Sequence, residues 1–271
     1  MLRRLRGGPP ALEVFERVWA FRFEATGGGA RLLPIEEPRL FDLDLLLGVE
    51  RGLERLLRNT ERFLEGRPAH HALLFGERGT GKSSAVRGLL PRYAGRGLRV
   101  VEVRKPDLPA LPTLLGWLRP VPKRFAVFLD DLSFDEGEPG FRELKAALEG
   151  SLEAPPENVR VIATSNRRHL VPERAEDNRG ARLDERGELH LGEAVEEKLA
   201  LADRFGLVIG FYGFDQETYL RIVRAYAGRA ALDLAEPELR ERALRFALER
   251  GSRSGRTARQ FVESLAERAL P

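Results

Sequence analysis

The octapeptide GERGTGKS, from Gly76 to Ser83, matches a Gly-x-x-x-x-Gly-Lys-Ser pattern that cradles phosphate groups. An apolar run at 72–75 comes directly before it, and a helix-like run at 82–90 follows. This order of strand, loop and helix is the context that the pattern requires. Glycines let backbone N–H groups approach phosphate oxygens, and the start of the helix adds a partial positive charge. The octapeptide therefore predicts a phosphate-binding loop.

The loop also supplies specific side chains. The Lys82 ammonium is placed to reach the outer phosphates of a nucleotide, and the Ser83 hydroxyl is placed to ligate Mg²⁺. The expected ligands are ATP or ADP, together with Mg²⁺. The expected nucleotide-binding residues are Gly76, Glu77, Arg78, Gly79, Thr80, Gly81, Lys82, Ser83 and Ser84.

Composition limits the class of protein. The chain has 271 residues, which suffices for one large domain or for a core with a smaller domain. It has no cysteine, which excludes disulfide bonds and thiolate chemistry. We expect a cytoplasmic protein without a membrane partner, because there is no spanning-length apolar run and no secretion signal. The net charge of +3 permits a nucleic-acid partner without favouring one.

Apolar patterns divide the chain into three expected parts. Residues 1–45 form an N-terminal extension with one amphipathic helix, and residues 214–271 form a small all-helical lid domain. Residues 46–213 alternate strand-like and helix-like runs, interrupted by a charged insertion near 172–193. This α/β pattern is typical of a parallel sheet sandwiched by helices, as in P-loop NTPases. The residues at helical spacing in the extension are Leu12, Phe15, Val18, Trp19 and Phe23.

The expected elements of the core follow from the same patterns. The expected strands are 72–75, 98–103, 125–129 and 159–164. The expected helices are 49–64, 82–90, 111–118 and 141–152.

Two of the expected strands end in polar side chains. Asp130 and Asp131 follow one, and Asn166 follows another. The carboxyl ends of parallel strands face the bound nucleotide. Asp130 is placed to hold Mg²⁺ through water, Asp131 to orient or deprotonate an attacking water, and Asn166 to position that water. Taken alone, each could equally be a capping or turn residue.

Three arginines are candidates for contact with phosphate. Arg204 precedes a short apolar run, and Arg256 and Arg259 open the last helix. Arginine stabilises charge on a transferring phosphoryl group, and its planar fork senses the γ-phosphate. In a chain so rich in arginine, each could also be a surface residue.

Over residues 45–271, the order of these segments resembles that of the AAA+ ATPases. A more specific resemblance is to a bacterial family of AAA+ ATPases, the DUF815 family. The motifs that carry it are LRNT at 57–60, DDLSF at 130–134, ATSNRRHL at 163–170, DRFGL at 203–207 and RSGR at 253–256. The AAA+ resemblance implies Walker A at 76–83, Walker B at 125–131, sensor 1 at Asn166, an arginine finger given to a neighbouring subunit at Arg204, and sensor 2 at Arg256 or else Arg259.

Two departures from the AAA+ pattern bear on activity. Many AAA+ proteins end Walker B in Asp-Glu, where this chain has Asp130 and Asp131. The shorter second carboxylate is expected to hold water less well and to slow hydrolysis. Threading AAA+ machines carry an aromatic loop after the second strand, and residues 104–109 here contain no aromatic residue. This absence disfavours a protein unfoldase.

The favoured function is an ATP-hydrolysing switch. It would assemble as a homo-oligomer, in a ring or an open ring, and remodel or load a protein or nucleic-acid client. One alternative is a P-loop small-molecule kinase, and another is a nucleotide-gated binding module with little hydrolysis. Arg167, Arg168 and His169 could contact DNA or could equally be solvated.

Overall fold

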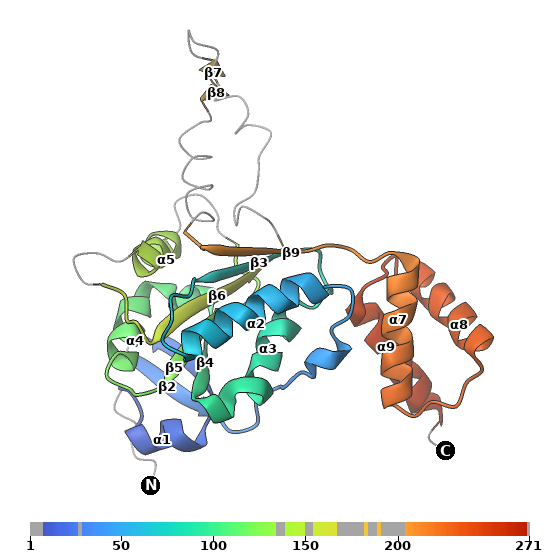
Figure 1. Ribbon diagram of the computed structural model, residues 1–271, viewed down its shortest axis with the longest axis horizontal. Coiled ribbons are helices and arrows are strands. Elements are labelled where there is room, and N and C mark those ends of the chain that lie inside the picture. Colours follow the sequence, from blue (N-terminus) through green and yellow to red (C-terminus); the bar gives the residue numbers. More distant parts are fainter. Residues whose placement is uncertain are drawn as a thin grey trace.

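A seven-stranded sheet forms the centre of the protein, in the order β2-β1-β4-β5-β6-β3-β9. The computed structural model describes residues 8–26, 29–133, 139–149, 154–166, 182–183, 189–190 and 204–269. Within the sheet, β2 runs antiparallel to β1, and the other neighbours pair in parallel (Figure 1). The strands are β1 (Ala20–Thr26), β2 (Gly29–Ile35), β3 (Ala72–Gly76), β4 (Leu98–Val103), β5 (Arg124–Leu129), β6 (Val159–Ser165) and β9 (Leu207–Phe211).

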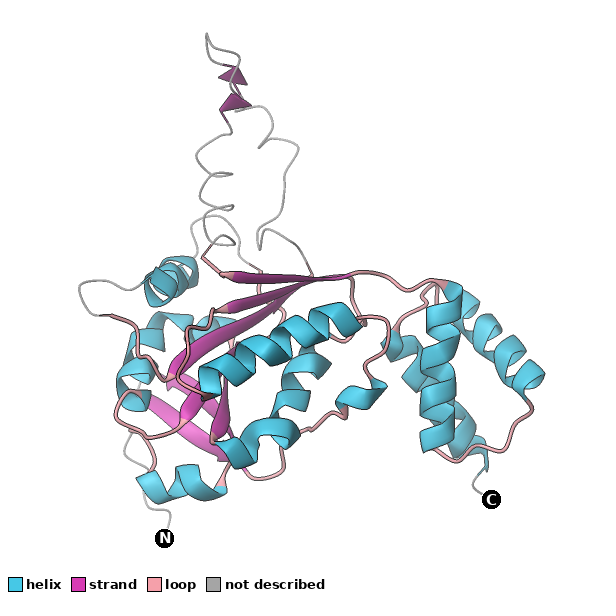
Figure 2. Ribbon diagram, in the orientation of Figure 1, coloured by secondary structure: helices cyan, strands magenta, loops and turns pink. Residues whose placement is uncertain are grey.

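Helices cover both faces of this sheet (Figure 2). Leu74 packs with α2 and α3, whereas its neighbour Leu73 packs with α4 and α5 on the other face. This alternation buries both faces, as the apolar strand sequences predicted. No helix among the described residues is long and apolar enough to span a membrane. The helices are α1 (Leu12–Arg17), α2 (Glu50–Leu64), α3 (Lys82–Tyr93), α4 (Leu111–Leu118), α5 (Pro139–Glu149), α7 (Gln216–Arg229), α8 (Glu236–Glu249) and α9 (Gly255–Ala269), with 3-10 turns η1 (Leu43–Leu45), η2 (Ala94–Arg96) and η3 (Lys105–Ala110).

The predicted α/β class is confirmed. Each core segment predicted as a strand or a helix is an element of that type. The four expected strands are β3, β4, β5 and β6, and the expected helices are α2, α3, α4 and α5. The strand β9, which forms an edge of the sheet beside β3, was not predicted. The charged insertion near 172–193 lies largely outside the described residues, which there include β7 (Arg182–Leu183) and β8 (Leu189–His190).

The N-terminal segment differs from the single amphipathic helix expected there. Helix α1 ends at Arg17, and the following residues form β1, which pairs with β2 as a hairpin and with β4 in parallel. Phe21 and Phe23 alternate with charged residues, and this period of two fits a strand. Both rings are fully buried. The helical prediction was therefore wrong for Val18, Trp19 and Phe23, and the hairpin extends the sheet beyond β4.

Buried polar contacts fasten this hairpin to the core. Asp107 in η3 accepts a hydrogen bond of 2.9 Å from the backbone N of Ala25 and one of 3.2 Å from Nε of Arg104. Before the hairpin, Nε of Arg99 in β4 donates to the carbonyl oxygen of Phe15 in α1 at 2.6 Å. Since buried polar groups are costly without partners, these contacts hold α1 and the hairpin against the core.

A helical bundle follows β9, as predicted, and is seen at the right of Figure 1. Helices α7, α8 and α9 pack around their own apolar cluster, in which Tyr219 and Phe261 are the largest buried side chains. Leu47, from the linker before α2, also packs against this cluster, while the adjacent Leu46 packs into the cluster under α2 and α3. Two consecutive residues therefore join the bundle to the sheet.

His71 should make the stability of the fold depend on pH. Its Nδ1 accepts a hydrogen bond of 2.9 Å from the backbone N of Val161, so this nitrogen carries no proton. Burial, helped by the charges of Arg160 and His70, lowers the pKa of His71 from 6.5 to about 4. Between these values the unfolded chain binds the extra proton, so stability is lost as the pH falls. We expect His71 to lower the free energy of unfolding by no more than about 3 kcal/mol between pH 7 and pH 4.

Urea denaturation at fixed pH values measures this effect. His71→Asn keeps a side-chain acceptor but cannot titrate, so its free energy of unfolding should fall less steeply over the same range. An equally steep fall in the variant would contradict the assignment.

Candidate functional site

Three parallel strands place polar residues at the edge of the sheet where the carboxyl ends of the strands lie. Strand β3 leads into the phosphate loop at Gly76, β5 ends before Asp130 and Asp131, and β6 ends before Asn166. Because β6 lies between β3 and β5, these three strand ends are neighbours. The fold thus brings together the predicted loop, carboxylates and amide.

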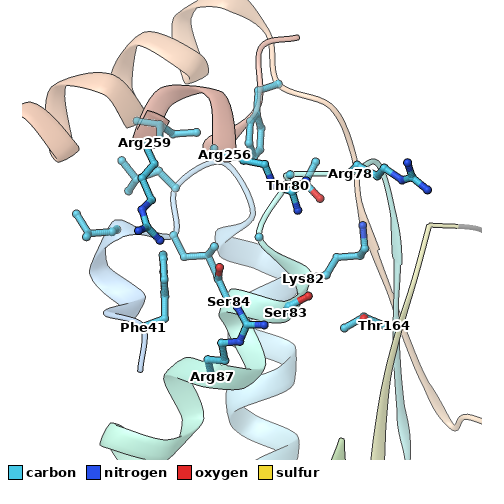
Figure 3. A pocket seen from close by; sticks show the side chains of 18 of the residues that line it. Phe41, Arg78, Thr80, Lys82, Ser83, Ser84, Arg87, Thr164, Arg256 and Arg259 are labelled. Carbon is cyan, nitrogen blue, oxygen red and sulfur yellow. The ribbon is translucent and has the colours of Figure 1, made fainter. Parts of the chain in front are cut away.

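A cavity of about 600 Å³ opens at this edge, between the sheet and helices α7 and α9 (Figure 3). Its volume lies within the range of small-molecule sites. Basic residues outnumber carboxylates in its described lining, and such an excess of positive charge suits a polyphosphate ligand. The charged lining residues are Arg39, Arg78, Lys82, Arg87, Arg256, Arg259, Asp130 and Asp131.

The phosphate loop depends on glycine conformations that other residues rarely adopt. Gly79 and Gly81 have φ angles of +79° and +103°. A Cβ on Gly81 would lie 2.3 Å from Cδ1 of Leu46, so that leucine side chain would have to shift to admit it. Helix α3 begins at Lys82, and its amino end adds a partial positive charge beside the cavity.

The Lys82 ammonium is held inside the loop. It donates to the carbonyl oxygens of Gly76 and Glu77 at 2.7 Å each, and to Oδ1 of Asn166 at 3.1 Å. Burial lowers the pKa of Lys82 below its usual value, and the carboxylates that follow β5 oppose this shift. An ammonium has three donors, so all are used. An entering phosphate must therefore take the place of one of these acceptors.

Asp130 lies at the centre of a hydrogen-bond network. Its Oδ1 accepts from the Ser83 hydroxyl at 2.6 Å and from the Thr164 hydroxyl at 2.7 Å. A guanidinium nitrogen of Arg87 lies 3.5 Å from Oδ2 of the same carboxylate. The hydroxyl and carboxylate oxygens of Ser83 and Asp130 are hard ligands of the kind that Mg²⁺ prefers, so the residues present fit this ion.

The fit to Mg²⁺ extends to the number of ligands. The described residues include no group of three or more His, Cys, Asp or Glu side chains that could hold a metal ion. Mg²⁺ commonly binds through one or two protein oxygens and completes its shell with phosphate and water. The Ser83 hydroxyl and the Asp130 carboxylate would supply this small number of protein ligands.

Asp131 has a backbone conformation that is uncommon outside glycine, with φ of +53°. The Thr164 hydroxyl stabilises it by accepting from the backbone N of Asp131 at 2.9 Å. Nδ2 of Asn166 donates to Oδ1 of Asp131 at 2.5 Å, while Oδ1 of Asn166 accepts from Lys82. The amide orientation follows, because its oxygen meets a donor and its nitrogen meets an acceptor. Asn166 thereby connects the ammonium to the second carboxylate.

The predicted arginines fall in two separate places. Arg256 and Arg259, on α9, line the cavity, and the backbone N of Arg256 donates to the Gly79 carbonyl at 3.3 Å. Arg259 forms an ion pair of 2.6 Å with Glu263. Arg204 precedes β9, which runs parallel to β3. It therefore lies at the amino ends of these strands, whereas the phosphate loop lies at the carboxyl end of β3. The structure therefore separates Arg204 from the other candidate residues of the same chain.

Several lining residues were missed by sequence reasoning. Arg87 lies one helical turn after Ser83 on α3, and this spacing could have indicated it. Thr164 was noted only as part of a strand end.

The apolar lining comes from segments distant from any motif, so the fold was needed to find it. This apolar patch consists of Phe41, Leu45, Leu46, Leu47, Phe214, Ile222 and Tyr226. The possible DNA-contacting residues 167–169 lie outside the described residues.

Comparisons with known proteins agree with this fold. The model of a family described as "Protein of unknown function (DUF815)" matches residues 16–269. No curated protein matches the chain. A point mutant of RuvB from Thermotoga maritima is similar in structure, with a TM-score of 0.56 and 15% identity, over 85% of this chain and 66% of its own. The FIGL-1 AAA domain in complex with ADP is similar with a TM-score of 0.54 and 19% identity, over 84% of this chain and 74% of the FIGL-1 chain.

These likenesses show the AAA+ fold. The chain spans slightly less than two thirds of that RuvB chain.

The Thr164 hydroxyl should support the site measurably, because it is buried and contacts both carboxylate residues. Thr164→Val removes the acceptor of the Asp131 N–H and a donor to Asp130. We expect the free energy of unfolding to fall by about 1–3 kcal/mol, as when a buried polar group loses its partner. Urea denaturation measures it. Thr164→Ser keeps the hydroxyl and serves as the control; equal losses in both variants would contradict this role.

Proposed function

Since the chain belongs to the DUF815 family and has the AAA+ fold, we propose that it is an ATP-binding and ATP-hydrolysing AAA+ protein. The observation that carries the proposal is the meeting of the phosphate loop, Asp130, Asp131 and Asn166 at one cationic cavity. The ADP complex of the FIGL-1 AAA domain supports a nucleotide in this position.

ATP would lie with its phosphates in the loop and its base against the apolar patch. Lys82 and the amino end of α3 would neutralise the phosphates. We assign the γ-phosphate contact to Arg256, because its backbone already contacts Gly79, whereas Arg259 is paired with Glu263. The guanidinium of Arg256 would then report whether the terminal phosphate is present.

Hydrolysis would divide the remaining roles between four side chains. Ser83 and Asp130 would hold Mg²⁺, which when bound neutralises charge on the phosphates. Asp131 would accept a proton from the attacking water, and Asn166 would orient that water with its amide. In the structure these two side chains contact each other, so they must separate before a water can lie between them.

The site would be completed between subunits. Arg204 precedes β9, at the edge opposite its own phosphate loop, so in an assembly it would serve the nucleotide of a neighbouring subunit rather than its own. We therefore propose a cytoplasmic homo-oligomer, in a ring or an open ring, that acts on a macromolecular client. Residues 46–213 would form the nucleotide-binding core and 214–271 the lid, with 1–45 as an extension that completes the sheet.

One observation favours a second candidate, a nucleotide-gated binding module with little hydrolysis. Oδ1 of Asp131 is already occupied by the amide of Asn166 at 2.5 Å. If ATP does not break this contact, the protein binds the nucleotide without turning it over. Turnover that stays negligible when the protein is oligomeric and ATP is bound would support this candidate over the ATPase.

Lys82→Ala should abolish nucleotide binding, because the outer phosphates lose their main cationic contact. We expect affinity for ATP with Mg²⁺ to fall by about 100-fold or more. Isothermal titration calorimetry measures it. Lys145→Ala, on α5 and away from the cavity, removes the same charge and should bind as the wild type does. Unchanged affinity in Lys82→Ala would overturn the phosphate-loop assignment.

Arg204→Ala should bind ATP normally yet lose turnover in the assembled state. We expect a loss of about a thousandfold or more, the range found for arginine fingers. ATP turnover is measured against protein concentration, with the mass determined in parallel. In the wild type, activity per subunit should rise as oligomers form. Arg22→Ala, on β1, is a control for the loss of a surface arginine.

If Arg204→Ala oligomers hydrolyse ATP normally, Arg204 is not the finger. If wild-type activity per subunit stays flat and the protein stays monomeric, the proposed inter-subunit site is wrong.

A further inference from the structure

Two sequence motifs, of which the proposed function uses only one, meet at the amino ends of β3 and β9. Asn59 belongs to the LRNT segment at 57–60, on α2, and Arg204 belongs to the DRFGL segment at 203–207. Residues 68–71, which lead into β3, form neither helix nor strand. This connecting loop contacts α2 on one side and the residues that follow Arg204 on the other.

The Asn59 side chain holds the connecting loop by both of its amide atoms. Its Nδ2 donates to the carbonyl oxygen of His70 at 2.9 Å, and its Oδ1 accepts from the backbone N of His70 at 3.0 Å. Nε of Arg62, further along α2, donates to the carbonyl oxygen of Pro68 at 2.9 Å. The loop lacks a strand partner for these backbone groups, so side chains of α2 satisfy them instead. The loop is therefore fixed to α2.

The residues after Arg204 pack against the same loop. The backbone N of Leu207 donates to the carbonyl oxygen of His71 at 3.1 Å. A Cβ on Gly206 would lie 2.4 Å from Nδ1 of His70, so the backbone approaches the His70 ring closely there. The position of the loop therefore sets the position of the backbone that immediately follows Arg204.

Rigid structure supports this arrangement on both faces of the sheet. On one face, Phe205 is buried in the apolar cluster that includes residues of α4 and α5. On the other face, α2 lies so close to β9 that a Cβ on Gly52 would be 2.8 Å from Cγ2 of Ile209 (Figure 1). The loop that Asn59 holds lies next to these two fixed parts and carries no regular structure of its own.

We propose that Asn59 is a positioning residue for Arg204. This inference rests on the proposed function, in which Arg204 serves the nucleotide of a neighbouring subunit. An arginine stabilises a transferring phosphoryl group only from the correct position, and a displacement of about 1 Å can cost on the order of a hundredfold in rate. Without Asn59, two backbone groups of His70 lose their partners, and the loop that supports residues 206–207 can shift. The loss of activity then occurs in the neighbouring subunit.

Mixed oligomers test this role, because one kind of subunit can be limited to supplying the arginine. Asp131→Asn removes the carboxylate that would take the proton but keeps an oxygen for the Asn166 amide, so this donor subunit should bind ATP without hydrolysing it. Wild-type subunits are mixed with an excess of donor subunits before ATP and Mg²⁺ are added, and turnover is measured per wild-type subunit. The donors carry Asp131→Asn alone, with Asn59→Ala, or with Arg204→Ala.

The donor with Asn59→Ala should lower turnover by about tenfold or more relative to the donor with Asp131→Asn alone. The donor with Arg204→Ala should lower it further. A merely structural role of Asn59 would not act across the subunit boundary. In unmixed oligomers, Asn59→Ala should lower kcat and leave the affinity for ATP with Mg²⁺, measured by isothermal titration calorimetry, as in the wild type.

Two further variants keep the test sharp. Alanine is a better helix former than asparagine, so Asn59→Ala should not weaken α2 itself. Should it fail to fold, Asn59→Asp keeps the acceptor for the His70 N–H, loses the donor to the carbonyl oxygen, and should lower turnover in the same direction. The matched control is Arg58→Ala, the preceding residue of α2, whose exposed side chain pairs with Glu54. This control should leave turnover unchanged.

The outcomes separate this inference from the proposed function. If the donor with Arg204→Ala lowers turnover and the donor with Asn59→Ala does not, the positioning role is wrong and the proposed function stands. An equal loss with Arg58→Ala would also overturn the positioning role. If no oligomer forms, or if the donor with Arg204→Ala has no effect, the proposed inter-subunit site is wrong and the role of Asn59 falls with it.

Discussion

The hydrogen bonds that Asp130 accepts from Ser83 and Thr164 hold together the cavity at the phosphate loop. Each partner comes from a different strand–helix unit, so distances of 2.6 and 2.7 Å require the registers of β3, β6 and β5 to be correct at once. A slip of one residue in β5 would turn Asp130 to the opposite face of the sheet. The positions of Lys82 and Asn166 depend on the same registers, because both contact residues from neighbouring strand ends.

The linker before α2 gives this rigid site a connection to the bundle. Leu46 and Leu47 pack into different apolar clusters, and Glu50 pairs with Arg221 of α7 at 2.8 Å. The apolar patch of the cavity includes residues of this linker and Ile222 of α7. A nucleotide base held there would contact the sheet side and the bundle at once. Its binding energy would therefore favour one relative orientation of the two, which is the requirement for a switch.

Sequence reasoning located the polar half of this site and missed the apolar half. The loop and the strand ends were found because parallel strands deliver their carboxyl ends to one edge, whatever the details of packing. The apolar patch depends on how the linker packs relative to α7, and no local sequence pattern predicts that packing. The hairpin was missed because Leu12 and Phe15 fit a helical period that the next residues do not continue. Phe21 and Phe23 follow a period of two. Pairing with β4 makes this segment a strand rather than a continuation of the helix.

The contacts from Lys82 through Asn166 to Asp131 bear on how such a switch could distinguish ATP from ADP. In the structure these groups satisfy one another, so none is left as a buried polar group without a partner. Under the proposed function, the terminal phosphate of ATP would compete with Asn166 for the Lys82 ammonium. Asn166 released in this way could turn to a water, and Asp131 would lose the amide that occupies it. ADP is one phosphate shorter and would leave the contacts intact. The short carboxylate of Asp131 would then be available as a base only when the γ-phosphate is present.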